Sequence, residues 1–265
     1  MNFPRLLPCL LLAAATAQAQ TYPSRVVRLV VPFTAGGSTD IVGRTVGQKL
    51  AELWGQPVVV DNRPGGSTVI GTDIAAKAPP DGYTLLVTPA PFAIVPGLIA
   101  KLPYDPAKDF EPITLINTTP LVVIVNPGVP ALTDLAGGHV DLLFNGLTSA
   151  MPLIRSGKAR ALAVTSITRA GALPDLPTLD ELGLKGFQAV AWNGLSAPAR
   201  TPRDIIARIN ADVLKVIRSP ELTERLKAEG SDPVGNSPEQ YNAFLRDEIA
   251  KWAKVIRFAG VKGLQ

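Results

Sequence analysis

The sequence predicts an α/β protein with a largely parallel sheet, helices on both faces, and a crossing of the chain into a second, smaller lobe. Apolar runs at 26–33, 57–62 and 83–90 alternate with segments of helical spacing, an order typical of parallel sheets. The long apolar stretch 113–125 is broken by Pro120, and we interpret it as a strand that leaves the first lobe and enters the second. Ligands of such sheets bind outside the carboxyl ends of the strands.

Each element of the first lobe has a local signal. Apolar residues recur at helical spacing between Asp40 and Leu53, and Gly55 is placed to end that helix. The strand at 57–62 leads into a glycine-containing loop, which opens a second helix within 63–78. A third strand follows at 83–90.

The second lobe is expected to contain few elements. The sequence predicts a strand at 139–145, a short helix at 149–158 and another strand at 160–165, before 187–199 carries the chain back to the first lobe. The expected divisions are a signal peptide at 1–20, a first lobe at 21–121 and 188–265, and a second lobe at 122–187.

Three helix starts in the C-terminal third share one device, a hydroxyl residue at the N-cap followed by proline. Gln240 lies three residues after Ser237, as a capping box requires, and Asp204 lies three residues after Thr201. Gly230 and Gly260 are placed to end helices. The three pairs are Thr201-Pro202, Ser219-Pro220 and Ser237-Pro238.

The first twenty residues have the pattern of a bacterial export signal. Arg5 precedes an apolar run at 6–15, and an A-x-A sequence ends at Ala19. The run is too short to span a bilayer permanently, and Cys9 lies inside it, as part of the segment that would be removed. We therefore expect a periplasmic protein that does not span the membrane.

Composition argues against several classes of function. His139 is the only histidine, Cys9 the only cysteine, and no G-x-S-x-G sequence occurs, so neither a nucleophile–base set nor a metal site is expected. The 26 basic and 22 acidic residues are scattered along the chain, and no segment combines a basic cluster with aromatic residues. We therefore do not expect nucleic acid as a partner. We expect no enzyme activity and no cofactor.

Two glycine loops are the candidate binding elements. Gly36–Thr39 and Gly65–Thr68 both read Gly-Gly-Ser-Thr, and each follows a predicted strand and precedes a helix. Such junctions present backbone N–H groups and hydroxyls at a helix N-terminus, which suits a carboxylate, although either loop alone could be only a tight turn. Asp40 is interpreted as a first-turn carboxylate that is favourable with the helix dipole. Arg63 beside the second loop could pair with a carboxylate or lie on the surface.

Several segments, in the same order along the chain, are similar to one known family. The chain resembles the Bug-type receptors, the extracytoplasmic solute-binding proteins of tripartite tricarboxylate transporters, in "YPSRVVRLVVPFTAGGSTDIVGR", "VVVDNRPGGSTVIGTDIAAKAPPDGYTLL", "LPYDPAKDFEPIT", "GKARALAVTS", "LPDLPTLDELGLKGF" and "WNGLSAPARTP". The resemblance implies a two-lobed periplasmic-binding-protein fold of type II, which closes on a small carboxylate and delivers it to a membrane transporter.

One departure from the family pattern affects the second lobe. Pro130 runs directly into Ala131, where the family has several dozen further residues, and Asn145 stands where the family usually has an acid. The shortened lobe leaves three alternatives open: weak binding, a different ligand, or a degenerate copy that binds nothing. A sensor in place of a transporter as the docking partner is a further alternative.

The expected ligand site combines both glycine loops with the end of the third strand. Ser149 and Trp192 are additional candidates. The residues expected to contact the ligand are Phe33, Ala35, Gly36, Gly37, Ser38, Thr39, Gly66, Ser67, Thr68, Thr88, Pro89, Ala90 and Asn145.

Overall fold

The computed structural model describes residues 22–125 and 142–261. The expected signal peptide, Cys9 and His139 lie outside the described residues. None of the helices in the described ranges combines the length and the apolar character that a membrane span requires.

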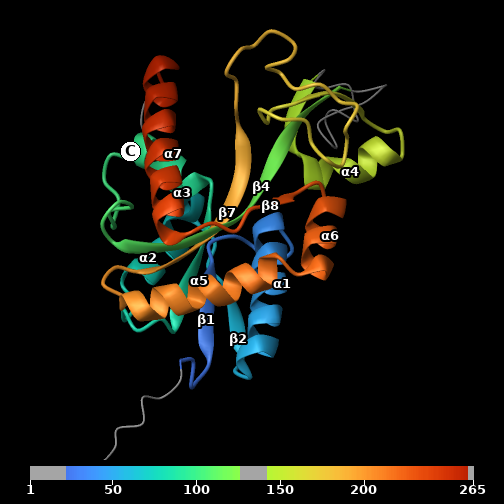
Figure 1. Ribbon diagram of the computed structural model, residues 1–265. Helices are drawn as coiled ribbons and strands as arrows, with labels where there is room; N and C mark the ends of the chain where they lie inside the picture. The colour runs from blue at the N-terminus through green and yellow to red at the C-terminus, as the bar shows by residue number, and fades with distance from the viewer. Residues whose placement is uncertain (1–21, 126–141, 262–265) are drawn as a thin grey trace, which may run out of the picture.

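The main sheet has the strand order β2-β1-β3-β7-β4 (Figure 1). β1 (Val27–Val31) pairs in parallel with β2 (Val58–Asn62) and β3 (Thr84–Pro89). β7 (Val190–Pro198) is antiparallel to both β3 and β4 (Phe110–Val125). The expectation of a largely parallel sheet is therefore wrong for this half. β7 returns from the second lobe, which lies beyond the carboxyl ends of β1 and β3, so it enters the sheet from that end and runs in the opposite direction.

Two cores cover the two faces of this sheet. One core joins it to α1 (Ser38–Trp54), α5 (Arg203–Ile217) and α6 (Pro220–Ala228). The other joins it to α2 (Val69–Ala76), α3 (Pro91–Leu98) and α7 (Pro238–Phe258). Successive residues of β1 alternate between the cores, as the two-residue period of a strand requires. The predicted layered architecture with helices on both faces is confirmed.

β4 belongs to both lobes. Figure 1 shows it as a long strand that runs from the main sheet to the small lobe. Its first part pairs with β7 as far as Pro120, and from Leu121 onward it pairs with β5 (Leu142–Gly146), and then also with β6 (Arg160–Val164). A third core lies there, between the end of β4 and α4 (Leu147–Arg155). The change of pairing partners lies next to the lobe boundary expected at 121/122.

The ends of the helices follow the predicted caps with one exception. Ser219 caps α6, and Ser237 with Gln240 forms a complete capping box on α7. Thr201 does not cap α5: its hydroxyl donates to the carbonyl of Pro198 at 2.7 Å, and Pro202 occupies the N-cap position. The hydroxyl is therefore used in the turn that precedes the helix.

Gly230 has a second role besides ending a helix. It adopts the left-handed conformation, with φ of 75°, before β8 (Asp232–Pro233), which pairs with β4. A Cβ at this position would lie 2.8 Å from Cγ of Leu147, the first residue of α4. The glycine therefore permits close packing between the C-terminal part of the chain and the second lobe.

Candidate functional site

A cavity of about 160 Å³ lies where the carboxyl ends of β1 and β3 face the second lobe. It is lined from the first lobe, from the second lobe and from the two strands that join them. None of these lining residues is charged: Phe33, Ser38, Thr39, Pro89, Ala90, Pro91, Thr119, Gly146, Thr148, Ser149, Ala191, Trp192 and Asn193.

The N-terminus of α1 forms one wall of this cavity. Gly37 is the N-cap and provides no side-chain cap, because glycine has no side chain. Ser38 and Thr39 are the first two helical residues. Among the described residues, their backbone N–H groups donate no hydrogen bond to any acceptor. Uncapped N–H groups and the positive end of the helix dipole favour an anion at this position.

The N-terminus of α4 lines the same cavity from the second lobe. Gly146 is its N-cap, again without a side-chain hydrogen bond, and Thr148 and Ser149 occupy its first turn. This helix belongs to the second lobe, whereas α1 belongs to the first. The cavity therefore lies between two helix N-termini from different lobes, and each of them adds hydroxyl groups.

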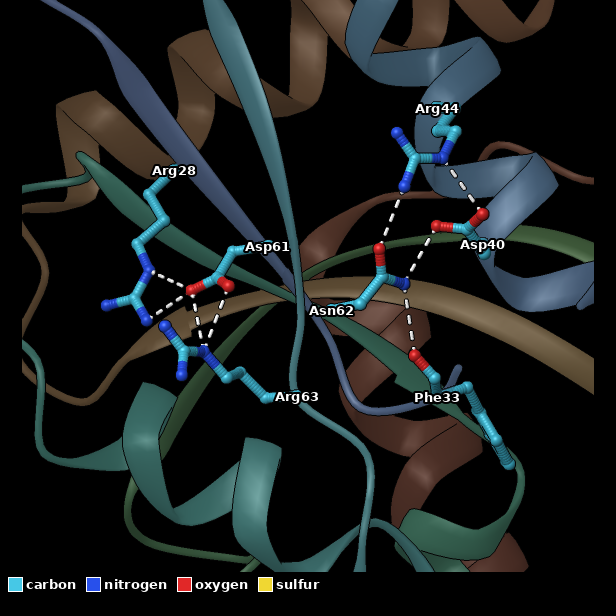
Figure 2. Close-up of polar contacts among 7 residues, drawn as sticks. All are labelled: Arg28, Phe33, Asp40, Arg44, Asp61, Asn62 and Arg63. Atoms are coloured by element: carbon cyan, nitrogen blue, oxygen red, sulfur yellow. Dashed lines mark hydrogen bonds and ion pairs between the residues drawn. The ribbon is translucent and has the colours of Figure 1, made fainter. Parts of the chain in front are cut away.

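A hydrogen-bonded cluster holds the loop before α1 (Figure 2). Asp40 is almost fully buried, and its carboxylate accepts from the Gly36 N–H at 2.8 Å, from Arg44 Nε at 2.9 Å and from Asn62 Nδ2 at 2.8 Å. Asn62 Nδ2 also donates to the carbonyl of Phe33 at 3.0 Å. Burial alone would raise the pKa of the Asp40 carboxyl, but these hydrogen bonds outweigh it and lower that pKa.

Asn62 ties the end of β2 to this loop. Its Oδ1 accepts from Arg44 at 2.8 Å, so its amide makes contacts with three residues of the loop and of α1. The expected role of Asp40 as a first-turn carboxylate is thus extended, since it also bonds the loop backbone. No local sequence pattern marks Asn62 for this role.

Arg63 pairs with a carboxylate of its own chain. Its Nε donates to both oxygens of Asp61, at 2.9 and 3.1 Å, and Arg28 approaches the same carboxylate from β1 (Figure 2). Burial would raise the pKa of Asp61, and the two arginines outweigh it, so the pKa is lowered. Arg63 is half exposed and is not among the residues that line the cavity.

A polar network backs the cavity where the lobes join. Asn193 of β7 donates to Asn117 Oδ1 at 3.2 Å, and Asn117 donates to Ser231 Oγ at 2.6 Å. The Thr119 and Ser231 hydroxyls are 3.0 Å apart. Trp192, beside Asn193, is fixed by its indole N–H, which donates to Glu248 at 3.2 Å. These bonds join β4 to β7 and to Ser231, the residue before β8, and join β7 to α7 behind the cavity.

The structure brings together only part of the predicted site. The second glycine loop, the 3₁₀ helix η1 (Gly66–Thr68), does not contribute to the lining, and neither do Ala35 and Gly37. The lining does include five predicted residues and both additional candidates, which are Phe33, Ser38, Thr39, Pro89, Ala90, Ser149 and Trp192.

Three predicted residues are engaged elsewhere. The Gly36 N–H, expected as a ligand donor, is bonded to Asp40. Thr88 is fully buried, and its hydroxyl bonds to Ser196 at 2.8 Å. The Asn145 side chain accepts from the N–H of Gly146 at 2.9 Å. Sequence reasoning missed Thr119, Thr148 and Asn193, because isolated polar residues within apolar runs form no recognisable pattern.

The described residues that line the site offer neutral binding groups. Hydroxyls, uncapped N–H groups and an indole wall are suited to holding an anion, and among the described residues no group of histidines, cysteines and carboxylates could hold a metal ion. A larger cavity, of about 630 Å³, lies between the starts of β4, α5 and α7. It is lined by one lobe only, so lobe closure cannot enclose a ligand there.

A cavity between two α/β lobes joined by crossing strands defines a solute-binding protein of the two-lobed periplasmic class. The family model for the tripartite tricarboxylate transporter family receptor matches residues 42–133 and 128–261, and the chain belongs to this family. Its members are receptors rather than enzymes.

Individual relatives agree with this membership. BugT of Bordetella pertussis is 33% identical over 99% of both chains. An R. palustris protein solved with adipate is 31% identical with a TM-score of 0.82, covering 92% of this chain and 100% of its own. MatC from Rhodopseudomonas palustris, solved with malate, is 28% identical with a TM-score of 0.77, covering 89% of this chain and 100% of its own.

These comparisons also locate the shortening of the second lobe. The alignment with BugT spans 324 positions, which exceeds the 265 residues of this chain by 59, so at least that many positions are gaps in this chain. The two matches to the family model meet at 128–133, between β4 and β5. The expected internal deletion, at Pro130 and Ala131, coincides with this break.

Proposed function

We propose that this chain is an exported receptor that captures a small carboxylate between its lobes for a tripartite tricarboxylate transporter. The observation that carries the proposal is the pair of helix N-termini, α1 from one lobe and α4 from the other, that both line one uncharged cavity. An acid that bonds to both would favour the closed arrangement of the lobes, because only that arrangement provides both contacts.

The size of the cavity supports a small ligand. Its volume of about 160 Å³ corresponds to about five water molecules at their share of liquid volume. This room suits an acid of a few carbon atoms. The related structures with adipate and malate support a carboxylate, and the pattern of an export signal at 1–20 supports a periplasmic location.

The binding test is a thermal-shift and calorimetric screen with malate, adipate, a monocarboxylate and an uncharged diamide. An acid at a hundredfold excess over its dissociation constant should stabilise the protein by about 2.7 kcal/mol. The diamide has the size of a dicarboxylate without its charge, so it should give no shift. Absence of a shift with every acid would instead support the alternative of a degenerate copy that does not bind.

A charge variant tests whether the ligand binds at the helix N-termini. Ser38→Asp puts a carboxylate where the ligand's carboxylate would lie, which should abolish the acid-induced shift and leave α1 intact, since an acidic residue is favourable in the first turn. The matched control is Gln48→Glu, which makes the same charge change at an exposed position of α1. Equal loss of binding in both variants would contradict the proposed location.

The transporter partner needs a separate experiment. Crosslinking the exported protein in membranes, with and without the acid found in the screen, should capture transporter subunits in a ligand-dependent manner. Capture of a sensor protein instead would support the alternative docking partner.

A further inference from the structure

One buried polar atom of the cavity lining has no hydrogen-bond partner within the part of the chain that the structure describes. It is Oδ1 of Asn193 in β7, a residue that is only 5% exposed. Buried acceptors are nearly always paired in folded proteins, so an unpaired one calls for a physical reason. Its place in the wall of a binding cavity suggests that the ligand supplies the missing donor.

The neighbouring hydrogen bonds fix which end of this amide is unpaired. Nδ2 of Asn193 donates to Asn117 Oδ1 at 3.2 Å, and Nδ2 of Asn117 donates to Ser231 Oγ at 2.6 Å. The single hydroxyl proton of Ser231 is directed to the carbonyl of Thr118 at 3.2 Å, so Ser231 accepts from Asn117 and fixes its orientation. Turning the Asn193 amide around would then place two carbonyl oxygens against each other. Its Oδ1 is therefore the end that points away from this network.

A small recess adjoins the cavity at Asn193. Its volume is about 10 Å³. The recess and the cavity have four lining residues in common, which are Ser38, Thr119, Thr148 and Asn193. A space of this size holds about one water-sized group, such as a hydroxyl, and is too small for a carboxylate. The recess therefore admits one small substituent of a ligand that occupies the cavity.

The polar groups around the recess favour a hydrogen-bond donor over an anion. Besides Asn193, the recess is lined by Glu229, whose carboxylate lies 3.3 Å from Arg225 Nε. An acid would place its own carboxylate at the helix N-termini and away from these acceptors. A hydroxyl needs only one acceptor for its proton, whereas an ammonium group has three donors to satisfy and a charge to desolvate. The recess is therefore suited to a hydroxyl.

We infer that Asn193 selects acids that carry a hydroxyl group, with its Oδ1 accepting the hydroxyl proton of the bound ligand. This role rests on the proposed function, which concerns carboxylates in general, and narrows the ligand to hydroxy acids. A site built to bond a hydroxyl rejects the analogue that lacks it, because the analogue leaves a buried acceptor unpaired. The helix N-termini then provide affinity for acids in general, and Asn193 provides the choice among them.

Calorimetric titration with matched pairs of acids tests this selection. Malate and lactate differ from succinate and propionate, respectively, by one hydroxyl. In each pair that binds, the wild-type protein should bind the better enantiomer of the hydroxy acid about tenfold more tightly, or more. The amine analogues aspartate and alanine should bind more weakly than malate and lactate.

The outcomes separate this role from the proposed function. Binding of succinate or propionate as tight as that of its hydroxy acid would overturn the role of Asn193 and leave a carboxylate receptor standing. Tighter binding of an amine analogue would overturn the assignment of the donor as a hydroxyl. Failure of all these acids to bind would overturn the proposed function and this role together.

A substitution assigns the selection to this side chain. Asn193→Leu keeps the approximate size and removes the acceptor, so a hydroxy acid and its partner should bind within about twofold of each other. Asn193→Ala carries the same expectation and covers the case in which leucine does not fit. The matched control is Ser196→Ala on the same strand, which removes a buried hydroxyl bonded to Thr88 and lies outside the cavity lining. It should keep the wild-type preference. A preference in the Asn193 variants equal to that of the control would overturn the role of this residue.

Discussion

Replacing Asn62 by alanine tests whether the end of β2 holds the loop that shapes the cleft. The substitution removes donors to the Asp40 carboxylate at 2.8 Å and to the Phe33 carbonyl at 3.0 Å, and an acceptor for Arg44. The bond to Asp40 dominates, because that carboxylate is buried and charged, whereas the Arg44 side chain is half exposed. Hydrogen bonds to charged groups contribute roughly 1.5–3 kcal/mol. We expect the free energy of unfolding to fall by about 2 kcal/mol.

Urea denaturation measures this loss as a lower midpoint at an unchanged slope. Gln48→Ala, which removes an exposed amide from the same helix, is the control, and its effect should stay within about 0.5 kcal/mol. A midpoint for Asn62→Ala that equals that of the control would refute the reasoning, because it would show that the loop is held without this amide.

The same cluster gives a pH dependence of known sign. The pKa of Asp40 is lowered from its ordinary value of 3.8 in the folded protein. A lowered carboxyl pKa contributes stability that is fully present above the unfolded pKa and is lost as the pH falls through the folded pKa. The wild-type protein should therefore lose stability below about pH 4. Asn62→Ala should lose less over that range, because it has already lost one of the bonds that lower the pKa.

Three further substitutions have expected effects that thermal or urea unfolding can measure. Gly194→Ala should destabilise by more than about 3 kcal/mol, since the new Cβ would lie 2.0 Å from the hydroxyl oxygen of Tyr241; a stable variant would show that this buried ring can move. Asp212→Asn should cost about 2 kcal/mol near neutral pH, because the buried carboxylate accepts from Arg208 at 2.6 Å and from Lys215 at 3.3 Å, and an amide has no charge to pair with them. Burial raises the pKa of Asp212 but its hydrogen bonds outweigh it and lower the pKa, so the difference between variant and wild type should shrink in acid and an unchanged difference would contradict this. Ser237→Ala should cost about 1 kcal/mol through the lost capping box of α7, and no loss would mean that water replaces the cap.

Local signals predicted most of the first lobe. The strands around β1, β2 and β3 and the helix that ends at Gly55 follow from apolar periodicity and from residues that stop helices, both of which act over a few neighbours. The direction of β7 could not be derived in the same way. It depends on where the second lobe lies, and this is settled by packing between segments that are far apart in the chain.

The site shows the same division. Ser38 and Thr39 were recognised because a glycine pair between a strand and a helix is a local pattern. The bond from the Gly36 N–H to Asp40 depends on the conformation of the loop, which composition does not give. Thr148 and Asn193 reach the cavity only because β4 and β7 carry the chain from one lobe to the other.

The two helix ends that line the cavity have a consequence for the arrangement of the lobes without a ligand. Each carries an effective charge of roughly +0.5, so an approach of α1 and α4 without an anion between them brings like poles together. The same helix N-termini that would bind the acid would repel each other in its absence. Electrostatic repulsion would then favour an open arrangement of the lobes, and added salt would weaken both this repulsion and the binding of the acid.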